Sequence, residues 1–124
     1  MGFAQRIEAS QDAPYTGDVV VLIDESAISQ AEHTCLMFEG ATQGRLRFVG
    51  TPTNGANGDV TSVSVPGGIT MMFSGHDVRH ADGRQLQRVG IQPDLMVAPT
   101  VAGIAAGRDE ILEAALELLT ADSG

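Results

Sequence analysis

The feature that most constrains the fold lies at residues 18–24, where five aliphatic residues are bounded by an aspartate on each side. A continuous β-branched run of this length predicts a strand covered on both faces, as in a parallel α/β sheet. Because parallel strands need a crossover connection, a helix should follow. Residues 29–44 predict this helix, because they carry apolar residues at helical spacing and Glu32 in the first turn. Residues 45–50 predict the next strand and complete a right-handed βαβ unit.

The rest of the chain predicts a mixed α/β arrangement. Residues 51–58 are rich in turn formers and predict a loop. Apolar and polar residues alternate over residues 60–78 on both sides of Pro-Gly-Gly, which indicates a hairpin. The adjacent Met71 and Met72 of this hairpin are expected to pack in the core. Further predicted features are a turn at Asp82-Gly83, a strand at residues 90–97 and an amphipathic helix at Asp109–Leu119 that carries Ile111, Ala115 and Leu118 on one face.

Length and composition limit the organisation of the chain. With 124 residues, the chain can form one domain or a piece of one. We interpret residues 1–14 as an irregular lead-in, residues 15–119 as the ordered part of the domain, and residues 120–124 as a disordered tail. The longest apolar run has the length of a strand, so no transmembrane segment is predicted.

The charge and the cysteine content exclude several classes of partner. A formal net charge of −9 would repel nucleic acid and anionic membrane surfaces alike, so neither is an expected partner. The lone Cys35 cannot form an internal disulfide, and no cluster of cysteines and histidines has the spacing of a zinc site. The sequence therefore predicts neither a metal nor a cofactor.

Ser29 is the most informative candidate for a functional residue. A strand that ends at Asp24 and turns into a helix at Ser29 would hold the hydroxyl at the electropositive helix N-terminus. Backbone N–H groups there can stabilise an oxyanion, which makes Ser29 a candidate nucleophile. The same spacing fits a simple helix cap, because Glu32 lies three residues later and completes a Ser-x-x-Glu capping box. Spacing alone favours the cap.

Residues 15–34 resemble a known peptidase family. They read Tyr-Thr-Gly-Asp, an apolar strand and Glu-Ser-Ala-Ile-Ser-Gln-Ala-Glu-His-Thr. The order is similar to the lead-in, strand and Ser-Ala-Ser-Ala-Ser-Glu motif of the tail-specific (C-terminal processing) protease family. Alignment on Glu32 places the family nucleophile at Ser29. Ordered matches over about 105 residues are more specific than one motif, and the later ones are Phe48–Gly50 with Thr53, Asp82–Arg84 and Gly90–Asp94.

The chain departs from this family at the general base. Well-known members use a lysine within Thr-Phe-Gly-Lys-Gly, whereas residues 53–58 read Thr-Asn-Gly-Ala-Asn-Gly, and the chain contains no lysine at all. Ala56 stands where the lysine would be, so a Ser-Lys dyad is excluded. A branch of the family that resembles tricorn protease uses a histidine from an earlier part of the chain. The resemblance therefore implies either a histidine base from an upstream part that is absent here, or a protein without catalysis.

The three histidines of the chain are weak candidates for this base. His33 lies four residues after Ser29 on the same helical face, and two side chains that project in parallel rarely reach attack geometry. His76 and His80 flank a predicted hairpin strand, where a surface role is the simpler interpretation. Candidates for the rim of the site or for support of an oxyanion are Gln30, Gly55 and Asn57.

The resemblance implies a crotonase-like α/β fold, shared with the Clp peptidase, in which a mixed sheet is flanked by helices. It implies a serine-type endopeptidase that acts on polypeptide substrates. The alternative is a non-catalytic module that binds a ligand or a peptide and keeps the same fold. The Gly-Gly turn that supplies an oxyanion-hole amide lies upstream in the family's usual order. We therefore interpret the chain as the C-terminal part of a catalytic domain that is inactive by itself.

The resemblance also bears on assembly and location. Removal of neighbouring strands would leave residues 18–24 with an unpaired edge and an uncovered face, so self-association or a homo-oligomer is expected. A periplasmic or secreted parent protein, with or without a peptide-recruiting PDZ-like domain, is implied by the family alone.

Overall fold

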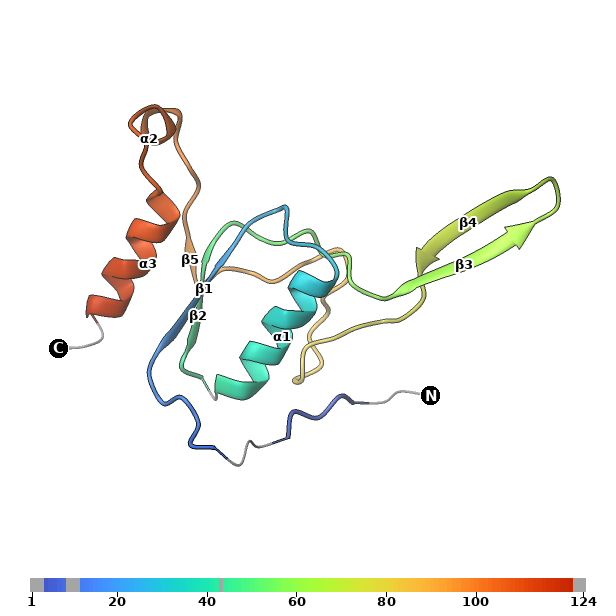
Figure 1. The fold of residues 1–124 in the computed structure, drawn as a ribbon, viewed down its shortest axis with the longest axis horizontal. Coiled ribbons are helices and arrows are strands. Elements are labelled where there is room, and N and C mark those ends of the chain that lie inside the picture. Colours follow the sequence, from blue (N-terminus) through green and yellow to red (C-terminus); the bar gives the residue numbers. More distant parts are fainter. Residues whose placement is uncertain (1–3, 9–11, 43, 122–124) are drawn as a thin grey trace.

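The computed structural model describes residues 4–8, 12–42 and 44–121. A small parallel sheet lies at the centre, helices lie on either side of it, and a long hairpin projects away from this body (Figure 1). The mixed α/β class predicted from the sequence is confirmed. The elements are, in order, β1 (Val19–Ile23), α1 (Gln30–Thr42), β2 (Leu46–Gly50), β3 (Val60–Val65), β4 (Ile69–Ser74), β5 (Leu95–Met96), α2 (Val101–Ala105) and α3 (Glu110–Ala121).

The βαβ unit predicted from the apolar run forms as expected. β1 pairs in parallel with β2, with Val19 opposite Leu46 and Ile23 opposite Gly50. β5 pairs in parallel on the other side of β2, so the strand order is β1-β2-β5. β1 is thus an edge strand, with no partner on its outer side among the residues that the structure describes.

The strand predicted at residues 90–97 is much shorter than expected. Only Leu95–Met96 forms β5, and the preceding residues are held by a mixture of backbone and side-chain hydrogen bonds to β2 and to the loop after it. The backbone N–H of Ile91 donates to Thr53 Oγ1 at 2.8 Å, and the Asp94 carboxylate accepts from the N–H of Phe48 at 2.7 Å. These bonds fasten the segment across the end of the sheet.

The core lies between the sheet and α1. Alternate β1 residues, Val19 and Val21, pack against it. α3 packs on β1 and β2 and buries Ala115, so the uncovered face expected for β1 is covered by α3. The buried residues that pack together in the core cluster are Ile23, Cys35, Leu46, Phe48, Leu86 and Ile91.

The predicted hairpin is present, but its methionines are not in the core. β3 and β4 pair antiparallel around the turn at residues 66–68 and project from the body (Figure 1). Met71 and Met72 are 56% and 70% exposed, so the expectation of core packing was wrong. A periodic apolar pattern predicts which face of a strand is apolar, but it does not identify what covers that face.

The C-terminal segment contains one helix that the sequence pattern did not reveal. α2 is a single short turn capped by Thr100, whose Oγ1 accepts from the N–H of Gly103 at 2.9 Å. Glu110, the first residue of α3, accepts hydrogen bonds from both the N–H and the hydroxyl of Thr100. α3 extends to Ala121, and residues 122–124 of the expected tail lie outside the described residues. None of the helices in the described ranges has the length and hydrophobicity needed to span a bilayer.

Candidate active site

Ser29 lies at the end of the turn that joins β1 to α1, immediately before the first helical residue. Its φ angle is +55°, a left-handed conformation that non-glycine residues adopt rarely and that costs about 1–2 kcal/mol. The backbone fixes this conformation from both sides, since Ser29 N–H donates to Ala56 O at 3.1 Å and Ser29 O accepts from His33 N–H at 2.9 Å. The side chain is exposed. Strain of this kind on an exposed hydroxyl is often found at functional sites.

The turn before Ser29 is held by Asp24. The Asp24 carboxylate accepts from the hydroxyl of Ser26 at 2.5 Å and from its backbone N–H at 2.9 Å. These bonds from Ser26 lower the pKa of Asp24 below its ordinary value, because they favour the charged carboxylate. Ala27 N–H donates to Asp24 O, which closes the turn that delivers the chain to Ser29.

Glu32 does not form the capping box that its spacing suggested. Its side chain is fully buried and binds the loop after β2, while the Ser29 N–H donates to Ala56 O. Glu32 Oε1 accepts from Thr53 Oγ1 and from Gly55 N–H, each at 2.6 Å, and Oε2 accepts from Ala56 N–H at 2.9 Å. Glu32 therefore ties the first turn of α1 to residues 53–56, and the same loop returns the Ala56 carbonyl to Ser29.

Gly55 is required by the geometry of this loop. Its φ is +75°, and a Cβ at this position would lie 2.8 Å from the backbone nitrogens of both Val89 and Gly90. Gly55 O also accepts from Arg88 N–H at 2.7 Å. Its own amide is bound by Glu32, so Gly55 shapes the site and does not offer that amide to an oxyanion.

Two buried polar atoms near this loop have no hydrogen-bond partner within the described part of the chain. They are Nδ2 of Asn57, which is 6% exposed, and Oε1 of Gln87. Asn57 follows the Ala56 that binds Ser29, and Gln87 precedes the Arg88 that binds Gly55. Buried polar groups are nearly always satisfied in folded proteins, so this donor and this acceptor are candidates to bind a group outside the described residues.

The sequence profile of Peptidase family S41 matches residues 3–97. This range includes the turn at Ser29, the Glu32 network and the Gly90–Asp94 segment. The chain belongs to Peptidase family S41. No curated protein sequence matches it significantly.

Solved structures agree with this family. A candidate peptidase from Parabacteroides merdae ATCC 43184 superposes with a TM-score of 0.76 at 29% identity, over 89% of this chain and 34% of that one. Mature CPAF complexed with lactacystin gives 0.66 at 26% identity, over 78% of this chain and 19% of that one. Tricorn protease superposes with a TM-score of 0.69 at 19% identity, over 86% of this chain and 10% of that one. At this identity the similarity supports the fold only. The chain thus spans about a third or less of the length of these proteins.

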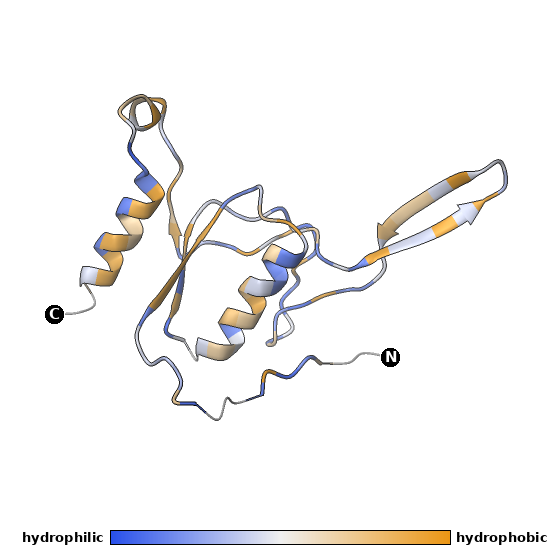
Figure 2. Ribbon diagram, viewed as in Figure 1, coloured by the Kyte–Doolittle hydropathy of each residue, from blue (hydrophilic) through white to orange (hydrophobic). Residues whose placement is uncertain are grey.

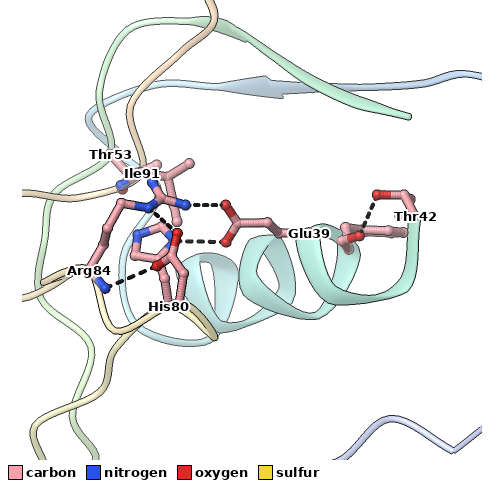
Figure 3. Close-up of polar contacts among 8 residues, drawn as sticks. Glu39, Thr42, Thr53, His80, Arg84 and Ile91 are labelled. Atoms are coloured by element: carbon pink, nitrogen blue, oxygen red, sulfur yellow. Dashed lines mark hydrogen bonds and ion pairs between the residues drawn. The ribbon is translucent and has the colours of Figure 1, made fainter. Parts of the chain in front are cut away.

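The structure does not bring His33 or His80 to the Ser29 hydroxyl of this S41 chain. His33 Nε2 lies 2.7 Å from Gln5 Oε1 in the N-terminal segment. His80 is buried, and its Nδ1 lies 2.7 Å from Glu39 Oε2, while Arg84 Nη2 binds Glu39 Oε1 at 2.5 Å (Figure 3). Glu39 is ten residues beyond Ser29, or about 15 Å along the helix axis.

His76 is nearer to the Ser29 loop along the backbone. Its N–H donates to Gly58 O at 2.7 Å, two residues after the Ala56 that binds Ser29. The His76 side chain is exposed at the base of the hairpin. Gln30, another predicted rim residue, is the first residue of α1, where helical N–H groups have no intrahelical acceptor.

Glu32 is the site residue whose contacts the sequence did not reveal. The Ser-x-x-Glu spacing drew attention to Glu32, but its hydrogen-bond partners lie 21 to 24 residues away. No group of three or more metal-binding side chains occurs within the described ranges.

Proposed function

We propose that this chain carries the nucleophile of a serine endopeptidase and that the nucleophile is Ser29. The observation that carries the proposal is the left-handed backbone of an exposed serine at a strand-turn-helix junction. A strained turn of this type raises a hydroxyl above its surroundings, where a substrate carbonyl can approach it. Membership of a peptidase family supports the same assignment.

In this reaction the Ser29 oxygen bonds to the carbonyl carbon of a polypeptide substrate. The serine proton passes to a general base, which then gives it to the departing amine as the C–N bond breaks. Water hydrolyses the resulting acyl-enzyme and restores the hydroxyl. We assign the base to a histidine outside this chain, because His33 and His80 have other partners here and the His76 side chain is exposed at the base of the hairpin.

We assign supporting roles in that chemistry to the N-terminus of α1, to Asn57, to Gln87 and to Glu32. The backbone amide of Gln30 and the dipole of α1 favour the negative charge that develops on the carbonyl oxygen. The unpartnered Asn57 Nδ2 can supply a further donor, and the unpartnered Gln87 Oε1 can accept from a ring N–H of the base. Glu32 acts through the loop as a positioning residue.

The test uses the longer parent protein and an unstructured polypeptide such as casein. We expect Ser29→Ala to abolish cleavage and the matched Ser26→Ala to retain most of it, since Ser26 only holds the turn through Asp24. Cleavage by the folded Ser29→Ala variant would refute the assignment. The 124-residue chain alone is expected to show no turnover, because we assign the base to a residue outside it.

The alternative is a non-catalytic binding module with the same fold. The observation that favours it is Ala56, which replaces the lysine of the well-known members in a chain without any lysine. Under this alternative the parent protein would bind peptides without cleaving them, and Ser29→Ala would leave both properties unchanged. Product analysis together with a binding isotherm separates the two functions.

A further inference from the structure

A cavity of about 270 Å³ lies beside the C-terminal half of α1, at the end of that helix away from Ser29. Its lining comes from α1, the first residues of β2, the turn at residues 80–84 and the segment before β5. We call it the α1 cavity. Ligand pockets measure about 300–1,000 Å³, so a volume just below this range fits a small molecule.

His80 brings a buried polar group to the α1 cavity. The residue is 6% exposed, and its Nδ1 lies 2.7 Å from Glu39 Oε2, while Arg84 Nη2 donates to Glu39 Oε1 at 2.5 Å (Figure 3). A carboxylate paired with a guanidinium only accepts hydrogen bonds, so Nδ1 carries the ring hydrogen. In the neutral ring Nε2 is then an acceptor, and no group in the described ranges donates to it. The ring is therefore held with an acceptor available to a ligand.

Arg47 brings a positive charge to the same cavity. Its Nη1 donates to Gly44 O at 3.3 Å and to Leu46 O at 3.0 Å, which orients the guanidinium without neutralising it. Within the part of the chain that the structure describes, no carboxylate forms an ion pair with Arg47, although acidic residues outnumber arginines by sixteen to seven. A guanidinium in this state favours a carboxylate, which it can bind through two parallel hydrogen bonds.

The acidic residues of the lining already have partners. Both oxygens of Glu39 are bound by His80 and Arg84, and Asp94 Oδ2 accepts from Phe48 N–H at 2.7 Å. These contacts leave Arg47 as the lining cation whose charge a ligand can balance.

The floor of the α1 cavity is apolar. Leu46, Phe48 and Ile91 line it and are 9%, 6% and 1% exposed, because they also belong to the core cluster. Figure 2 shows that the central sheet beside α1 is mainly hydrophobic in colour. A ligand with an apolar body would therefore gain more from this site than a bare inorganic anion.

We propose that the α1 cavity binds a small organic acid that carries a hydrogen-bond donor next to its carboxylate and an apolar side chain. The carboxylate binds Arg47, the donor binds His80 Nε2, and the apolar side chain lies on Phe48 and Ile91. The donor is a hydroxyl or an ammonium group, so hydroxy acids and amino acids share this chemistry. The proposal is independent of whether Ser29 is catalytic.

NMR titration of the nitrogen-15-labelled 124-residue chain tests the proposal with four probes of one carbon skeleton. We expect 3-phenyllactate, phenylalanine or both to shift the backbone amides of Phe48 and Ile91 in a saturable way, and the stronger of the two identifies the donor. 3-Phenylpropionate lacks the donor and 3-phenyllactamide lacks the charge, so each should bind about tenfold more weakly or worse. No saturable shift with any probe would overturn the proposal, as would equal affinities for 3-phenyllactate, phenylalanine and 3-phenylpropionate.

Variants of the chain test the two polar contacts separately. Arg47→Gln should weaken binding of the stronger probe by about tenfold, whereas the same change at Arg79, which pairs with Asp77 instead, should change it less than about threefold. His80→Asn keeps a donor for Glu39 at the position of Nδ1 but has no atom at Nε2, so it should abolish the preference for that probe over 3-phenylpropionate. Equal effects of the two arginine variants, or a preference that survives in folded His80→Asn, would overturn the proposal. If a variant does not fold, the four probes on the unmodified chain still decide.

Discussion

Replacement of Glu32 by glutamine should destabilise the chain strongly, although the change is nearly isosteric. The carboxylate accepts three hydrogen bonds and is fully buried. A glutamine amide can place its oxygen at the Oε1 position and keep two of them. Its NH2 group then faces the N–H of Ala56, donor against donor.

The magnitude follows from the bond that is lost. A hydrogen bond to a charged group contributes about 1.5–3 kcal/mol, and a buried donor left without a partner costs about 1–3 kcal/mol. Removal of the charge recovers part of the desolvation free energy of the buried carboxylate. We therefore expect Glu32→Gln to lower the free energy of unfolding by about 2–4 kcal/mol, a large part of the stability of a small domain.

Urea denaturation followed by circular dichroism measures this effect. Glu117→Gln is the matched control, because Glu117 is exposed on α3 and its loss should change stability by less than about 0.5 kcal/mol. Equal midpoints for the two variants would refute the role of Glu32 as the anchor of the loop. A more stable Glu32→Gln variant would show that burial of the charge outweighs the hydrogen bonds.

Two further predictions concern the turn at Ser29. Ser29→Gly should be more stable than Ser29→Ala by about 1 kcal/mol in urea denaturation, because glycine adopts a positive φ without strain; equal stability would contradict the left-handed backbone. Ser26→Ala should raise the pKa of Asp24 in a carbon-13 NMR titration. Because folding lowers this pKa, the charged Asp24 carboxylate stabilises the folded state at pH values above its ordinary pKa. This stabilisation is lost as the pH falls through the pKa of the folded state. An unchanged pKa in the variant would contradict the Ser26 bonds.

Local sequence pattern was sufficient for the βαβ unit. The aliphatic run predicted β1, the following helical spacing predicted α1 within two residues, and the two elements place Ser29 at their junction. The hairpin was also predicted, because its turn and its alternation are local signals. The local pattern did not predict that the hairpin is exposed, because exposure depends on which other elements pack against it.

Contacts distant in sequence explain the rest. Glu32 fits a capping box by spacing, but a buried carboxylate is stabilised best by several donors, and the loop after β2 supplies three. His80 binds Glu39 across 41 residues of sequence. Neither pairing has a signal in the linear pattern, and both depend on how the loops close over α1.

Covalent labelling of the longer parent protein with a fluorophosphonate tests the central claim most directly, because this probe traps an activated serine. Mass spectrometry of the labelled protein should locate the adduct on Ser29. The adduct should be absent from Ser29→Ala and present in Ser26→Ala. A folded parent protein that takes up no label, or that is labelled at a different serine, would contradict the account.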